Sequence, residues 1–248
     1  MKPVQGGVCR IRDLRCLVLD HWSRSSRCLL YRESSSSATD ICVNIIVGGL
    51  TAAGKTTHAL LIAKSLGYDY VSASSLLADR LRIEPDESNT LWVTKFDKLE
   101  KLRDLEPIDR EINEHLSTEL GRRDYTVFDS WSAAWLESST PCVRICIESG
   151  GNARALKARV SQEPHGPYLS ISSCRQLIDQ KDESTAVRLS PLLGCDVRYD
   201  RSPFDLVLDN SMLIREPTIA SARQGIATFH DQLVRAVAAR LDRLADLP

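Results

Sequence analysis

One eight-residue segment limits what this chain can fold into more than any other feature. Residues 49–56, Gly-Leu-Thr-Ala-Ala-Gly-Lys-Thr, match the pattern G-x-x-x-x-G-K-[ST] at every position. A β-branched run over 42–47 precedes the segment, and apolar residues at helical spacing over 58–66 follow it and end at Gly67. The pattern therefore predicts a buried strand, a glycine-rich phosphate-binding loop and a helix, in that order.

The residue types within this loop suit a phosphate chain. Gly49 and Gly54 let the backbone curl so that successive N–H groups point at phosphate oxygens. We expect Lys55 to reach the β- and γ-phosphates and the Thr56 hydroxyl to ligate magnesium. The predicted binding segment is Gly49, Leu50, Thr51, Ala52, Ala53, Gly54, Lys55, Thr56 and Thr57. The sequence thus predicts a site for ATP, or GTP, with Mg²⁺.

The rest of the chain alternates between strand and helix patterns. Further strands are predicted over 68–72, 125–128, 143–147 and 204–208, and helices over 74–82, 107–120 with its end at Gly121, 152–160 and 217–244. This alternation predicts an α/β fold of the P-loop NTPase type, with a five-stranded parallel sheet flanked by helices. Residues 1–40 are expected to be a poorly ordered extension, and 41–248 a single domain.

Charge and cysteine content narrow the function classes. The formal net charge is −1, whereas a general binder of nucleic acid or membrane surfaces needs a basic excess. The longest apolar runs are shorter than the roughly 20 residues of a membrane span. The eight cysteines contain no C-x-x-C pair, so free thiols are expected. We expect a cytoplasmic monomer or homodimer that acts on a small molecule, with no nucleic-acid or membrane partner.

A GTPase is one alternative, because residues 94–97, Thr-Lys-Phe-Asp, imitate a guanine-recognition motif. The segment lies only about forty residues past the loop, and no D-x-x-G stands between them. We prefer to interpret it as a polar stretch that enters a helix.

From the loop onward, over roughly residues 42 to 240, the chain resembles the archaeal-type cytidylate kinases within the nucleoside monophosphate kinases. Besides the loop, the resemblance is carried by 70–73, 107–112, 133–136, 181–184 with Arg188, 194–196 and 204–207. It implies an ATP-dependent kinase with an acceptor-binding region at about 72–121 and a lid at about 162–203.

The lid region contains two cations with an expected role. Lys181 and Arg188 are seven residues apart, two helical turns, and so share one helix face. The resemblance implies that this face closes over the transferring phosphate, where it would stabilise developing negative charge. Arg175 is a weaker candidate, and Ala186 stands where the family has a further lid arginine.

The acceptor region departs from the family. Ala78 and Trp131 occupy positions where the family carries arginines that grip the acceptor phosphate. Arg80, Arg82 or Arg110 could substitute, since one helical turn shifts a guanidinium into reach.

Asp129 and two tryptophans complete the candidate site. Asp129 ends the third predicted strand, where open α/β sheets place active residues. It could orient magnesium through water, hold the acceptor, or serve as a base toward a hydroxyl group. Trp131 and Trp135 could stack on a flat acceptor ring or pack in the core.

Three functions follow from these residues. The leading hypothesis is transfer from ATP to CMP or dCMP, with Lys55, Asp129, Lys181 and Arg188 in the catalytic site. A second is a kinase of a neutral hydroxyl acceptor such as a nucleoside, a sugar or an antibiotic-pathway intermediate, with Asp129 as base. A third is a nucleotide-binding regulatory protein without transfer activity.

Overall fold

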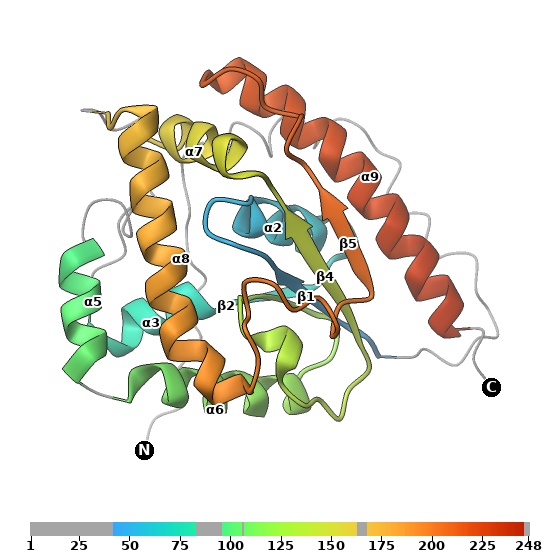
Figure 1. The fold of residues 1–248 in the computed structure, drawn as a ribbon. Helices are drawn as coiled ribbons and strands as arrows, with labels where there is room; N and C mark the ends of the chain where they lie inside the picture. Colours follow the sequence, from blue (N-terminus) through green and yellow to red (C-terminus); the bar gives the residue numbers. More distant parts are fainter. Residues whose placement is uncertain (1–41, 83–95, 106, 163–167, 246–248) are drawn as a thin grey trace.

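A parallel sheet forms the centre of the protein (Figure 1). The computed structural model describes residues 42–82, 96–105, 107–162 and 168–245. Within them, five strands pair in the order β2-β3-β1-β4-β5, and every pairing is parallel. The strands are β1 (Asn44–Gly48), β2 (Asp69–Ser72), β3 (Thr126–Asp129), β4 (Cys142–Glu148) and β5 (Leu206–Asp209). The predicted fold class is therefore confirmed.

Helices connect and cover these strands. They are α2 (Lys55–Leu66), α3 (Ala73–Arg80), α5 (Phe96–Leu105), α6 (Ile108–Arg122), α7 (Gly151–Val160), α8 (Ile171–Leu193), α9 (Ile219–Ala245) and the short 3₁₀ helix η2 (Ala133–Trp135). The predicted helix 107–120 ends two residues too early: α6 continues to Arg122, and the Arg123 N–H still bonds to the Glu119 carbonyl oxygen.

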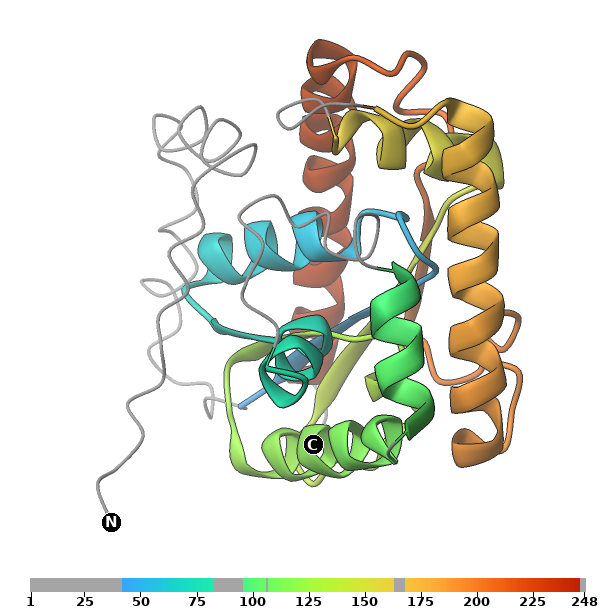
Figure 2. The ribbon, with the colours of Figure 1, turned by 90° about the vertical axis from the view of Figure 1, so that its left-hand side faces the viewer.

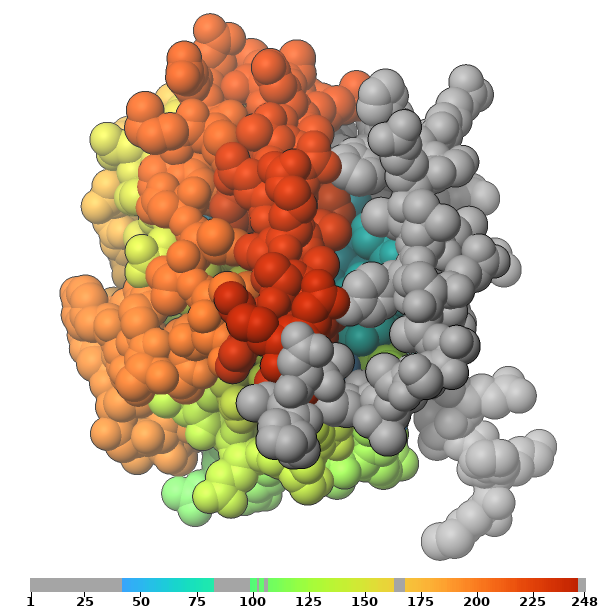
Figure 3. Space-filling model, turned by 90° about the vertical axis from the view of Figure 1, so that its right-hand side faces the viewer, coloured from blue at the N-terminus to red at the C-terminus, as the bar shows by residue number. Residues whose placement is uncertain are grey.

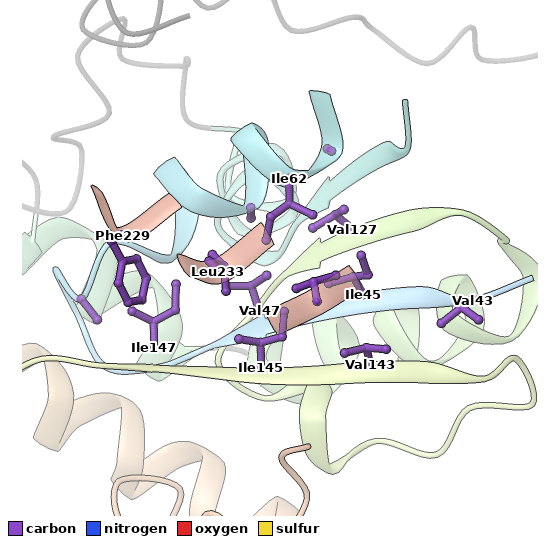
Figure 4. Packing of buried hydrophobic residues seen from close by; sticks show 14 residues of the cluster. Val43, Ile45, Val47, Ile62, Val127, Val143, Ile145, Ile147, Phe229 and Leu233 are labelled. Atoms are coloured by element: carbon purple, nitrogen blue, oxygen red, sulfur yellow. The ribbon is translucent and has the colours of Figure 1, made fainter. Parts of the chain in front are cut away.

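The two faces of the sheet bury separate apolar clusters. On one face, alternate residues of β1, β3 and β4 pack against Ile62 of α2 and against Phe229 and Leu233 of α9 (Figure 4). On the other face, Ile46 and Phe128 pack against α6 and η2. Burial on both faces explains the apolar run from Ile45 to Val47 in β1.

Helix α9 extends along one side of the molecule (Figure 3). Gly225 lets it approach the segment after β5, since a Cβ there would lie 2.4 Å from the Leu213 carbonyl oxygen. None of the helices in the described ranges has the length and apolarity needed to span a membrane. The five cysteines of those ranges are free thiols: Cys42, Cys142, Cys146, Cys174 and Cys195.

Two histidines are buried together between α2 and α9. The ring of His58 lies 4.8 Å from that of Phe229 and 6.1 Å from that of His230, which contacts Ser65. Burial lowers the pKa of His58 to about 3 and that of His230 to about 4. Both rings are therefore neutral in the folded protein at physiological pH.

This pair predicts a loss of stability in mild acid. The unfolded chain binds protons at these histidines below pH 6.5, whereas the folded protein does not, so stability falls as the pH decreases through 6.5. Between pH 6.5 and 5.5 each histidine is expected to cost about 1 kcal/mol. Thermal unfolding over this interval should lower Tm by about 4–8 °C.

Single variants distinguish the contribution of this histidine pair to the pH dependence of Tm from that of other titrating groups. His230→Gln should halve the pH dependence of Tm, whereas His115→Gln, at an exposed position of α6, should leave it unchanged. Lys157 and Lys181, whose pKa burial lowers to about 7, alter stability mainly above pH 7. A Tm that is constant between pH 6.5 and 5.5 would contradict the assignment.

Candidate nucleotide-binding site

The loop between β1 and α2 has the backbone geometry that an anion site needs. Gly49 has φ +135° and Gly54 has φ +105°, both in a region that favours glycine. A Cβ at Gly49 would lie 2.3 Å from the Ile147 carbonyl oxygen of β4. The N-terminus of α2 has no side-chain cap, so its N–H groups are available to a phosphate.

Lys55 begins α2 and points back over this loop. Its Nζ donates to the Leu50 carbonyl oxygen at 2.8 Å. Burial lowers the pKa of Lys55, while the carboxylates of Asp129 and Asp182 act in the opposite direction. Its ammonium group is thus close to the loop, to the end of β3 and to helix α8.

Asp129 lies on the sheet face that α2 covers. It shares that face with Val127, two residues before it, which packs in the same cluster as Ile62 of α2. The Tyr70 hydroxyl donates to Asp129 Oδ2 at 2.9 Å, and Asp129 is 4% exposed. A hydroxyl from Thr56 at the start of α2 and this carboxylate are both hard oxygen donors, so the residues present fit Mg²⁺.

Two polar residues that the sequence did not indicate, Lys157 and Asn210, donate hydrogen bonds to the backbone of the loop. Lys157 of α7 donates to the Ala53 carbonyl oxygen at 3.3 Å, to Ser149 Oγ at 2.7 Å and to Asn210 Oδ1. Asn210 Nδ2 donates to the same carbonyl at 2.9 Å. The position of Asn210 just after β5 was the available signal, since carboxyl ends of parallel strands meet at one edge.

Lys181 directly precedes Asp182, which bonds to the Thr51 N–H, so Lys181 lies on the part of α8 that meets the loop. Burial lowers the pKa of Lys181 to about 7, and the neighbouring Lys55 ammonium is the next cause. Asp182 and Glu100 raise it in return. Three of the predicted site residues, Lys55, Asp129 and Lys181, are thus brought together.

Arg188 points toward α5 and makes contacts that the sequence did not predict. It donates to Glu100 Oε2 at 2.6 Å and to Asp104 Oδ1 at 2.5 Å. Arg103 joins the cluster through Glu100 at 3.1 Å and Asp109 at 2.5 Å. Helices α5 and α8 lie side by side in both ribbon views (Figures 1 and 2). The predicted lid cation is therefore paired with carboxylates of α5, which lies in the predicted acceptor region.

Both tryptophans make packing contacts, and both also face a pocket beside the loop. The Trp135 ring meets Phe204 edge-on at 5.3 Å, and its Nε1 donates to Asp200 Oδ2 at 2.7 Å. Trp131 packs against the same apolar cluster as Ala186 of α8. Both tryptophans line a small pocket beside Gly49, to which Arg201 contributes its side chain.

The suggested substitutes for the missing arginines lie on the surface of the acceptor region. Arg80 pairs with Glu111 at 2.7 Å, and its side chain is 47% exposed. Arg82 and Arg110 are exposed as well. By contrast, Lys181 is next to the loop-binding Asp182, and Arg201, which pairs with Glu148 at 2.7 Å, lines the pocket beside Gly49.

A parallel sheet whose central strand leads through G-x-x-x-x-G-K-[ST] into a helix defines a P-loop protein. The chain is similar to archaeal cytidylate kinases, which makes it a kinase homologue. It is 28% identical over 172 residues to the enzyme of Natronomonas pharaonis, covering 68% of this chain and 81% of the relative. With that of Pyrococcus abyssi it is 24% identical over 193 residues, 77% of this chain and 98% of the relative. No protein-family model matches the chain.

Among solved structures, the chain is similar to a shikimate kinase from Acinetobacter baumannii, with a TM-score of 0.46 and 11% identity. That match covers 81% of this chain and 95% of the other. An uncharacterised protein from Eubacterium ventriosum gives a TM-score of 0.48 and 12% identity, covering 76% and 98%.

Proposed function

We propose that the protein transfers the γ-phosphoryl group of ATP to a nucleoside monophosphate, with CMP or dCMP as the leading acceptor. The observation that carries the proposal is the complete P-loop: Lys55 bonds to it at Leu50, Asp182, the neighbour of Lys181, bonds to it at Thr51, and Asp129 lies in register with Val47 just before it. The similarity to cytidylate kinases over more than two thirds of the chain supports the acceptor class.

In this proposal each residue has an electrostatic or positioning role. The loop N–H groups and Lys55 hold the β- and γ-phosphates, and Lys181 adds positive charge where the transferring group develops negative charge. Thr56 and Asp129 hold Mg²⁺, which neutralises phosphate charge when bound. Arg188 closes over the transfer once its pairing with Glu100 and Asp104 is exchanged for phosphate. The reaction needs no covalent intermediate.

A second candidate, a kinase of a neutral hydroxyl acceptor, is favoured by one observation. Ala78 and Trp131 occupy the positions of acceptor-binding arginines, and Trp131 packs in an apolar cluster. Against it, Asp129 lies on the α2 face and accepts a hydrogen bond from Tyr70, a placement that suits a magnesium partner better than a base.

The test is ADP release from Mg-ATP across a panel of acceptors: ribo- and deoxyribonucleoside monophosphates, nucleosides and simple sugars. Acceleration by CMP, dCMP or UMP supports the proposal. Acceleration only by an uncharged compound replaces it with the hydroxyl-kinase hypothesis. Tight ATP binding without acceleration by any acceptor leaves a regulatory protein.

Asp129→Asn distinguishes the two enzymatic candidates. With a monophosphate acceptor, which is already anionic, we expect turnover to fall by about 10- to 100-fold, because the amide keeps an oxygen near the metal but loses its charge. With a hydroxyl acceptor and Asp129 as base, turnover would be abolished while ATP binding survives. Asp124→Asn, an exposed carboxylate just before β3, is the matched control and should retain full activity.

A further inference from the structure

Asp182 of α8 is a buried carboxylate that reaches the phosphate-binding loop. Its Oδ1 accepts the backbone N–H of Thr51 at 3.0 Å, although the two residues are 131 positions apart. Its Oδ2 accepts a hydrogen bond from Arg154 Nη1 of α7. Asp182 is only 5% exposed. A charge this deeply buried is stable only when it is paired and hydrogen-bonded, as it is here.

Arg154 of α7 binds the other polar group of the Thr51 backbone, its carbonyl oxygen. Its Nη1 also donates to the Thr51 carbonyl oxygen at 3.2 Å, and the residue is 6% exposed. Thr51 thus has its N–H bound by Asp182 and its C=O bound by Arg154. The residue that follows, Ala52, has φ +59°, a conformation that L residues rarely adopt without such support.

Helix α8 does not need Asp182 to stay in place. Its first half packs through Cys174 and Ile178 against α7, and its second half packs through Ala186 and Leu189 against the cluster that contains Trp131. Arg188 adds ion pairs to α5. The bond of Asp182 to Arg154 adds to the docking of α8 on α7, whereas its bond to the Thr51 N–H acts on the loop.

We propose that Asp182 is a positioning residue that, through the Thr51 N–H, holds the loop in its phosphate-binding shape before nucleotide arrives. A loop fixed in advance loses less conformational freedom on binding, so affinity for the triphosphate increases. The inference rests on the proposed nucleotide site, but its structural part concerns the ligand-free protein.

The single variant Asp182→Asn leaves the buried guanidinium of Arg154 without its charged partner. It is a poor test, because it can unfold the protein. A matched pair in an Arg154→Leu background avoids this. Arg154→Leu/Asp182→Asn keeps an oxygen acceptor for the Thr51 N–H, whereas Arg154→Leu/Asp182→Ala removes it. Neither leaves Arg154 or Asp182 as an unpaired buried charge, and both change the charge near Lys55 and Lys181 equally. Glu183→Gln, an exposed acid on the same helix that pairs with Arg198, is the surface control.

Hydrogen exchange of a peptide spanning residues 49–57, without ligand, is the first readout. We expect it to be about three- to tenfold faster in the alanine member than in the asparagine member, with exchange of β1 and β3 unchanged. Mg-ATP should bind the alanine member more weakly by a similar factor, with kcat the same for both. Equal loop exchange in the pair, or faster exchange throughout the sheet, would overturn the inference. If wild-type protein binds no nucleotide, the proposed function fails while the exchange experiment still decides the role of Asp182.

Discussion

Lys55→Met is expected to lower phosphoryl transfer by at least about 10²- to 10³-fold, because it removes the cation that lies over the loop. Folding stability should be unchanged or higher. Burial lowers the pKa of Lys55, so keeping its ammonium charged costs free energy that a thioether side chain does not require. Activity and thermal unfolding measured on one preparation test both statements.

The control for this variant is Lys64→Met. Lys64 is also on α2, but it is exposed and lies in the last turn, at the end of the helix away from the loop. Its replacement should leave activity within about twofold of wild type. Equal activity of the Lys55 and Lys64 variants would show that the loop lysine takes no part in transfer.

Gly49→Ala is expected to be the most damaging single-methyl change in the site. The added Cβ would meet the Ile147 carbonyl oxygen at 2.3 Å while φ stays at +135°. Because that oxygen belongs to the backbone of a central strand, the loop must move. We expect a loss of at least about 2–4 kcal/mol in the free energy of unfolding, together with loss of nucleotide binding.

Gly67→Ala separates the steric effect from the cost of a positive φ. Gly67 ends α2 at φ +69°, and a Cβ there would have no atom within 4 Å. Its replacement should cost only about 1 kcal/mol and leave nucleotide affinity unchanged. Similar denaturant midpoints for the two variants would mean that the contact with Ile147 is not the cause.

The sequence predicted those features that depend on local patterns. The loop, its strand and α2 were found because a short motif and two apolar periodicities determine them together. The strands of Ile45 and Ile145 were found because both are rich in β-branched residues. These predictions needed no knowledge of which segments meet in space.

Contacts between distant segments could not be predicted in the same way. Arg188 was expected at the phosphates, but its carboxylate partners Glu100 and Asp104 are on α5, more than 80 positions away. The bond between Asp182 and Thr51 spans 131 positions. No periodicity records such pairings, because they arise only when the helices dock on the sheet.

Residue types that suit more than one environment were also hard to assign from the sequence. A tryptophan suits an apolar core and a flat ligand equally well, and the contact of Trp135 with Phe204 becomes visible only in the structure. His58 and His230 have no spacing in the sequence that would indicate a pair, and yet their rings stack between α2 and α9.

The central claim, transfer to a nucleoside monophosphate, is tested most directly by following the phosphoryl group itself. ATP labelled at the γ-phosphate would be incubated with Mg²⁺ and CMP, and the products separated, with the Lys55→Met protein as control. The account predicts label in CDP, and none in CDP with the variant. Label that remains in ATP, or appears only in inorganic phosphate or in an uncharged acceptor, would contradict it.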